Sequence, residues 1–206
     1  QYLTVTAEDR FDRLESGEID ILCGVTTKTL ERAERVGFSQ LTFATGGALL
    51  SMDGPTRIER LSDLAGGKIA VGSGTSTLEV LTARLDADGV AAEIVEMPSA
   101  DASIDALLAG EVDAYAADQV VLVGKVLSQT DSSLSYFLAG DLFSFEPLAL
   151  AFAYGDTDFG LTADRALARL YRTGAVLQIY DLWFGAFGQS ATEAQRALWQ
   201  LGATPE

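Results

Sequence analysis

Residues 105–118 read DALLAGEVDAYAAD, and this stretch contains the structural unit from which we predict the fold. It begins as the end of an apolar helix, stops at Gly110, and continues through Glu111 and Asp113 into an apolar strand. Residues 12–20, DRLESGEID, repeat the same order of helix end, glycine stop and acidic entry into a strand. Two copies of one helix–glycine–strand unit indicate that the chain forms two similar lobes.

Strands and helices alternate outward from both copies of this unit. Apolar and β-branched stretches predict strands or extended segments at residues 2–6, 18–23, 41–52, 68–72, 92–97, 111–117 and 135–154. Amphipathic stretches with cap or stop signals predict helices at residues 9–16, 58–64, 77–85, 100–109, 119–128, 162–173, 176–184 and 191–199. This alternation predicts an α/β fold with parallel strands.

The extended stretches 41–52 and 135–154 are the expected crossovers between the two lobes. We therefore assign residues 1–46 and 146–206 to a discontinuous first lobe and residues 47–145 to the second. We expect a ligand between the lobes, because binding sites form preferentially where two domains meet.

The composition narrows the functional classes. Of the 206 residues 48% are hydrophobic, which is enough for a substantial core, and the formal net charge is -16. So acidic a surface repels phosphate backbones, and we expect no nucleic-acid partner. Histidine, the commonest general base and transition-metal ligand, is absent from the sequence. Zinc sites, serine triads and Cys–His dyads are therefore disfavoured, and we expect no metal.

Two further features bear on location and redox chemistry. No apolar run approaches the ~18 residues of a membrane span, and the opening residues QYLTVTAEDR are typical of a strand rather than a signal peptide. The single cysteine, Cys23, excludes an intramolecular disulfide, and we expect it to be a small buried residue rather than a reactive thiol.

A first candidate binding corner spans residues 23–39, CGVTTKTLERAERVGFS. A strand end leads into a threonine-rich turn, and the turn opens a short helix that carries Arg32 and Arg35. Unpaired N–H groups at a helix start, threonine hydroxyls and a planar guanidinium together suit a carboxylate. The alternative is a threonine turn that only caps the helix, with both arginines solvated.

A second candidate corner is the glycine-rich loop at residues 71–76, VGSGTS, which precedes a helix. Ser76 and Glu79 have the spacing of a capping box, so the loop is either an anion-binding helix start or an ordinary capped helix. No Gly-Lys-Ser/Thr closes it, so it is not a P-loop. Asp118 ends the strand 111–117 and either pairs with an ammonium group or caps the helix that begins at Gln119.

An ordered set of residues along nearly the whole chain resembles a known family. In chain order these residues are Arg10, Leu14, Gly17, Asp20, Thr27, Glu31, Arg32, Phe38, Ser39, Leu61, Asp63, Leu64, Gly66, Ser73, Gly74, Thr75, Ser76, Gly110, Glu111, Val112, Asp113, Ala114, Asp118, Glu146, Pro147, Gly174, Trp183 and Phe184. The set resembles the extracytoplasmic polar amino-acid-binding proteins of ABC importers, solute-binding protein family 3. The stretch CGVTTKTLER is most similar to the glutamate/aspartate-binding branch.

This resemblance implies a two-lobed periplasmic-binding-protein (type II) clamshell that is not an enzyme and has no cofactor. In the first lobe, it implies that Arg32 clamps the α-carboxylate of an amino acid. Thr27 would add its hydroxyl and backbone N–H, and the Val25 carbonyl would face the α-ammonium group.

In the second lobe, the resemblance implies that Thr75 and Ser76 at the helix start complete the carboxylate site. Asp118 would pair with the α-ammonium group. A zwitterion held by both lobes would favour a closed form, which would deliver it to the membrane permease of an ABC importer. The implied location is periplasmic or extracellular, with or without a lipid anchor.

The sequence departs from the family pattern at two places. Family members usually begin with a β-α-β segment that this sequence does not contain, so we expect the first lobe to lack it. Leu148 and Ala149 follow the Glu–Pro pair where the family often has Tyr–Gly.

Three other classes remain open at this point. The same fold serves as the ligand-binding sensor domain of membrane receptors and kinases. It also serves cyclohexadienyl-dehydratase-like enzymes, for which the acid would be Glu146 or one of three lysines, Lys28, Lys68 and Lys125. A non-binding interaction module is the last alternative.

Overall fold

A computed structural model describes residues 1–55, 57–128, 135–185 and 190–205. The chain divides into two compact units. Unit 1 contains Gln1–Asp9 and Thr45–Glu146, and unit 2 contains Arg10–Ala44 and Pro147–Glu206. The chain enters unit 1 at Thr45 and leaves it after Glu146, inside the extended stretches 41–52 and 135–154. Unit 1 contains the residues that we assigned to the second lobe, and unit 2 most of those that we assigned to the first. Gln1–Asp9 differ from that assignment, because they belong with unit 1.

Unit 1 is built on a five-stranded sheet with the order β5-β4-β6-β3-β7. Its strands are β3 (Gly47–Met52), β4 (Lys68–Gly72), β5 (Glu93–Met97), β6 (Ala114–Asp118) and β7 (Tyr136–Leu138). As predicted, β4 runs parallel to β5 and to β6, and helices make those crossover connections. By contrast, β3 runs antiparallel to both β6 and β7, so the sheet is mixed.

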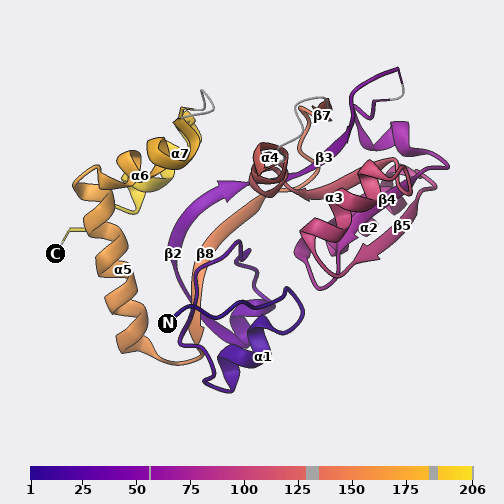
Figure 1. Cartoon of the computed structure of the whole chain (residues 1–206). Coiled ribbons are helices and arrows are strands. Elements are labelled where there is room, and N and C mark those ends of the chain that lie inside the picture. Colours follow the sequence, from indigo (N-terminus) through magenta and orange to yellow (C-terminus); the bar gives the residue numbers. More distant parts are fainter. Residues whose placement is uncertain (56, 129–134, 186–189, 206) are drawn as a thin grey trace. The chain divides into compact units, whose positions relative to one another are not determined.

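Helices cover both faces of this sheet (Figure 1). They are η2 (Leu61–Leu64), α2 (Ser76–Asp88), α3 (Ala100–Leu108) and α4 (Gln119–Ser128). Because side chains alternate along a strand, Ile69 of β4 packs in a cluster with Leu81 of α2, and the adjacent Ala70 packs in another with Ile104 of α3 and Leu122 of α4. The sheet is therefore buried on both faces, which explains the apolar run of β4.

Unit 2 contains a three-stranded sheet with the order β1-β8-β2 (Figure 1). Its elements are α1 (Arg10–Glu15), β1 (Ile21–Leu22), η1 (Arg32–Glu34), β2 (Val36–Thr45), β8 (Glu146–Ala153), α5 (Thr157–Arg172), α6 (Ala175–Phe184) and α7 (Glu193–Leu201). The central strand β8 comes from the second half of the chain, and both of its neighbours come from the first. The two α/β sheets confirm the predicted fold class.

The helices after β8 are tied to β2 by aromatic side chains. Tyr171 of α5 donates its hydroxyl to the carbonyl of Leu41 at 2.9 Å, and the indole N–H of Trp199 on α7 donates to the carbonyl of Thr42 at 2.9 Å. Tyr180 of α6 completes this cluster, with its ring 5.8 Å from Trp199. Buried Tyr and Trp rings thus supply both apolar area and a satisfied polar group.

Two predicted features are wrong. Residues 2–6 are not a strand: they belong with unit 1, where none of the described strands pairs with them, and an extended segment becomes a strand only when a neighbouring strand pairs with it. Cys23 is exposed rather than buried: β1 ends at Leu22, and the residues that follow it, Cys23 to Val25, are all exposed.

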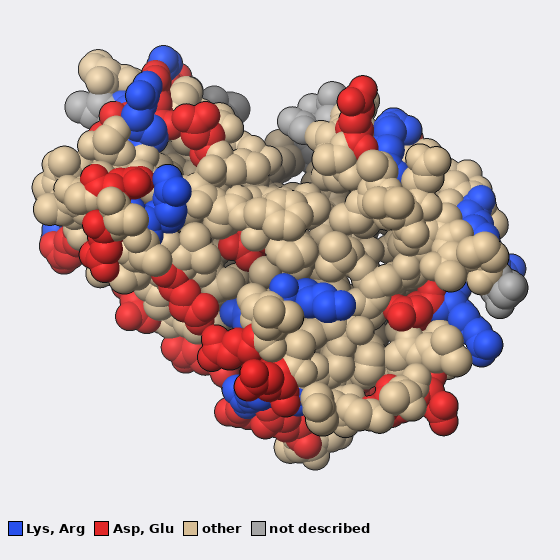
Figure 2. Space-filling model, turned by 180° about the vertical axis from the view of Figure 1, so that it is seen from behind, with Lys and Arg blue, Asp and Glu red and all other residues tan. Residues whose placement is uncertain are grey.

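Acidic residues outnumber basic ones by 30 to 14 in the sequence, and acidic side chains are spread over the face drawn in Figure 2. Within the part of the chain that the structure describes, no helix is long and apolar enough to cross a membrane.

A packing contact in unit 2 yields the first prediction. The Phe152 ring lies against Gly37 of β2, where an added Cβ would come 2.3 Å from it. Gly37→Ala should therefore lower the free energy of unfolding by about 1–3 kcal/mol, measured by urea denaturation. Gly24→Ala is the control, since a Cβ there meets no atom within 4 Å. Equal stability of the two variants would contradict this account of the packing.

A buried phenol yields the second prediction. Burial raises the pKa of Tyr115 on β6 to about 12. In the unfolded chain this phenol ionises near pH 10. The folded state therefore binds one proton more between pH 10 and 12, and unfolding becomes easier across that window by about 2 kcal/mol. Tyr115→Phe should reduce this alkaline loss in denaturation at pH 9 and 11.5. An unchanged pH dependence would mean that Tyr115 does not contribute to it.

Candidate functional site

The predicted binding loop of unit 2 is held on the first residues of β8. Thr27 bridges antiparallel to Leu148, and the N–H of Lys28 donates to the carbonyl of Pro147 at 2.8 Å. Thr26 and Thr27 are buried. These contacts fix the backbone of residues 26–28, although the sequence predicts a turn there.

Arg32 lies beside this loop. Its Nη1 donates to the carbonyl of Thr27 at 3.1 Å, and its backbone N–H donates to Thr29 Oγ1 at 3.1 Å. Thr29 thus accepts a hydrogen bond at the start of this turn, although the cap residue of η1 is Glu31, which makes no side-chain cap hydrogen bond. The predicted helix is only the three-residue 3₁₀ turn η1, too short for a substantial dipole, so charge at this corner comes from the guanidinium.

Arg10 of α1 also hydrogen-bonds to this loop. Its Nη1 donates to the carbonyl of Val25 at 3.0 Å and to Thr26 Oγ1 at 3.4 Å, and its side chain is buried. The Val25 carbonyl, which the resemblance assigns to the α-ammonium group, thus already accepts one hydrogen bond. Sequence reasoning gave Arg10 no role, because fifteen positions separate it from Val25.

Three guanidinium groups surround the ring of Phe11. Arg10, Arg32 and Arg35 lie 5.0, 5.5 and 5.9 Å from its centroid. Arg35 faces outward to exposed carboxylates of α1, which raise its pKa, whereas Arg10 and Arg32 hydrogen-bond to the binding loop. In a chain of net charge -16, this is a local concentration of positive charge suited to a carboxylate.

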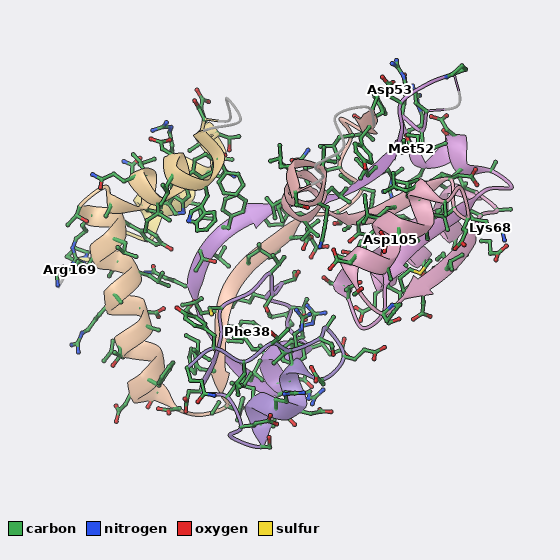
Figure 3. All side chains as sticks on the ribbon, in the orientation of Figure 1. Phe38, Met52, Asp53, Lys68, Asp105 and Arg169 are labelled. Atoms are coloured by element: carbon green, nitrogen blue, oxygen red, sulfur yellow. The ribbon has the colours of Figure 1, made fainter. Side chains whose placement is uncertain are left out.

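The edge of this corner carries an aromatic residue on β2. Phe38, labelled in Figure 3, lies 6.0 Å by its ring centroid from the ammonium group of Lys28. Lys28 also donates to the carbonyl of Ser39 at 3.4 Å. A further cation and an aromatic face thus lie next to the loop.

In unit 1, the predicted helix start is α2. The cap is Thr75 rather than Ser76, because Thr75 Oγ1 accepts from the N–H of Leu78 at 3.2 Å and donates to the carbonyl of Gly72 at 2.7 Å. Gly74 has a φ of +67°, which explains the glycine in this loop. Ser76 is the first helical residue, and its hydroxyl donates to a carboxylate, Glu146 Oε2, at 3.1 Å.

Asp118 is the last residue of β6 and is buried. Its partner across the sheet is Gly47, and the N–H of the next residue, Gln119, donates to the carbonyl of Gly46 at 2.8 Å. Strand pairing therefore places this acid beside the segment through which the chain enters unit 1.

The structure thus gathers the predicted residues into two sets. Val25, Thr27 and Arg32 lie together in unit 2, and Thr75 adjoins Ser76 in unit 1, where Asp118 ends a strand of the same sheet. Two hollows in unit 1, of about 270 and 440 Å³, include none of these six residues. Among the described residues, no three or more acidic or cysteine side chains are grouped to hold a metal ion.

Comparison with known proteins identifies the family. Residues 1–186 match the bacterial extracellular solute-binding proteins, family 3, and the chain belongs to this family, as the resemblance predicted. Among its relatives, an L-glutamate/L-aspartate-binding protein of Pseudomonas aeruginosa is 29% identical over 184 residues, covering 89% of this chain and 60% of the relative. A glutamine-binding protein of a Bacillus subtilis ABC transporter is 28% identical over 185 residues, covering 89% and 64%.

Solved structures agree with the fold. An ancestral arginine-binding protein bound to arginine has a TM-score of 0.80 and 26% identity, covering 89% of this chain and 80% of that one. The same kind of ancestral protein bound to glutamine has a TM-score of 0.77 and 28% identity, with 86% and 76% covered. The chain spans about three fifths of the length of the curated relatives it matches. These relatives are named as binding proteins, which supports the prediction that the protein is not an enzyme.

Two of the three arginines around Phe11, Arg10 and Arg35, provide a matched comparison. Arg10→Met should lower the free energy of unfolding by about 2–3 kcal/mol, because a buried side chain that donates a charged hydrogen bond to the Val25 carbonyl is lost. Arg35→Met removes exposed ion pairs and a guanidinium–Phe11 contact that Arg10→Met also removes, and it should cost less than about 1 kcal/mol. Urea denaturation of both variants measures the difference. Equal losses would show that the hydrogen bonds of Arg10 do not hold the loop.

Proposed function

We propose that this protein binds a polar or acidic L-amino acid outside the cytoplasm and delivers it to the permease of an ABC importer. The observation that carries most weight is the guanidinium of Arg32, held beside the buried Thr27 in a chain of this family. A planar, permanently charged fork next to a hydroxyl and backbone amides is the chemistry that recognises an α-carboxylate.

We propose that each unit contributes half of the binding site. In unit 2, Arg32 and Thr27 bind the α-carboxylate, and the second lone pair of the Val25 carbonyl accepts from the α-ammonium group. The buried position of Asp118 in unit 1 supports its proposed role as the anionic partner of that ammonium group.

For Thr75 and Ser76, we propose that backbone N–H groups in the first turn of α2 make the ligand contacts. Their hydroxyls already have partners within unit 1, and helix starts offer N–H groups without intrahelical acceptors. A zwitterion bound by both units would favour one arrangement of the chain, which is how a binding protein signals occupancy to a permease.

The ligand class rests on the relatives. Two are named for glutamate, aspartate or glutamine, and two solved ancestral proteins hold arginine or glutamine. All four ligands share the zwitterionic backbone and a polar side chain, so we propose that this chain binds an amino acid with a polar or acidic side chain.

A thermal-shift screen of the chain against the twenty amino acids tests the proposal, followed by calorimetry on any ligand found. A ligand that binds only the folded state raises the melting temperature. We expect a shift with at least one polar or acidic amino acid, and no shift with any of the twenty would contradict the proposed function.

Arg32→Ala should weaken this ligand by about 2–4 kcal/mol, roughly 30-fold or more, because a desolvated carboxylate loses its partner. Arg13→Ala is the matched control, since Arg13 forms a partly exposed ion pair with Glu18 in the same unit. Calorimetric affinity that is equal in the two variants would remove Arg32 from the site.

Asp118→Asn should weaken α-amino acids more than the corresponding des-amino acids, because only the former carry the ammonium group. Competition calorimetry measures both classes. An equal loss for both would assign Asp118 a purely structural role.

A further inference from the structure

A buried carboxylate in unit 1 has no role in the function proposed above. Glu146 is the last residue of unit 1, and its side chain is only 1% exposed. Its Oε2 accepts from Ser76 Oγ at 3.1 Å, and its Oε1 accepts from Ser144 Oγ at 2.8 Å. Ser144 Oγ in turn accepts from the N–H of Gly47 at 2.8 Å. We call these four residues the Glu146 network.

The network joins three separate parts of unit 1. Gly47 lies just after the chain enters the unit, Glu146 lies where the chain leaves it, and Ser76 begins α2. The single hydroxyl proton of Ser144 goes to Glu146, which leaves a lone pair for Gly47. Each hydrogen bond of the network therefore has one defined donor and one defined acceptor.

Local geometry leaves the network little freedom. An added Cβ at Gly47 would come 2.5 Å from the Phe143 ring and 2.8 Å from Ser144 Oγ, so only glycine fits there. The N–H of Phe143 also donates to the Gly47 carbonyl at 2.8 Å. Pro147 follows Glu146 and restricts its backbone to extended conformations.

The cost of burying Glu146 indicates a purpose beyond stability. Removing a carboxylate from water costs several kcal/mol unless hydrogen bonds and a favourable electrostatic field compensate for the lost hydration. Here two hydroxyl donors and the N-terminal end of the thirteen-residue helix α2 supply that compensation. A neutral side chain would avoid this cost, whereas a carboxylate holds both serines in fixed directions.

We infer that Glu146 is a positioning residue for ligand binding. Its carboxylate fixes the first turn of α2 through Ser76, and it ties that turn to both segments through which the chain enters and leaves unit 1. The inference rests on the proposed function, in which the same turn presents N–H groups to the ligand. Glu146 itself does not touch the ligand in this account.

A double-mutant cycle tests the inference, using Glu146→Gln, Ser76→Ala and the combined variant in the full chain. Calorimetry with the amino acid found in the thermal screen gives the affinities. If Glu146 acts through Ser76, each single change weakens binding about tenfold. A tenfold loss of affinity corresponds to the net free energy of one ordinary hydrogen bond. Adding Glu146→Gln to Ser76→Ala should then have little further effect. Glu93→Gln, at an exposed ion pair of unit 1, should leave affinity unchanged.

Amide hydrogen exchange of the ligand-free protein provides a second readout. Glu146→Gln should speed exchange in peptides covering residues 73–78, and Glu93→Gln should not. Full additivity in the cycle, or unchanged affinity with unchanged exchange, would overturn the role of Glu146 while the proposed function stands. A wild-type chain that binds no amino acid would overturn the proposed function and this role together.

Discussion

The three-stranded sheet of unit 2 depends on β8, which lies between β1 and β2. The central strand belongs to the second half of the chain and its neighbours to the first, so neither half alone can pair its strands. Side chains reinforce the pairing: the N–H of Leu150 donates to Ser39 Oγ at 3.0 Å, and Thr42 Oγ1 donates to the carbonyl of Leu148 at 3.2 Å. Contacts this distant in sequence cost loop-closure entropy, which buried strand pairing must offset.

The candidate site depends on the same strand. The first residues of β8 hold the loop that carries Thr27, and Glu146, which opens β8, holds the first turn of α2. One strand thus contacts residues that we propose bind the ligand, Thr27 in unit 2 and Ser76 in unit 1, through separate interactions. A change at the start of β8 is therefore expected to affect both of these sets of residues, even though no residue of β8 is among the six proposed to touch the ligand.

Local sequence signals predicted much of the fold. The helix Gln119–Ser128 and the strand Lys68–Gly72 occur with the predicted bounds, because their periodicity and end signals are local. The antiparallel placement of β3 and the exposure of Cys23 depend on tertiary pairing, which no local pattern encodes. In the site, the family resemblance brought six residues forward, but the sequence did not predict the hydrogen bonds of Arg10 to Val25 and of Glu146 to Ser76. Both act through partners 15 and 70 positions away.

The most direct measurement is the mapping of backbone amide chemical shifts during titration of the isotope-labelled chain with its amino acid. The account predicts that the largest changes fall in residues 25–32 of unit 2 and in residues 73–78 and 118–119 of unit 1. Changes confined to one unit, or centred on the hollow lined by Arg60 and Arg84, would contradict a site shared by these two sets.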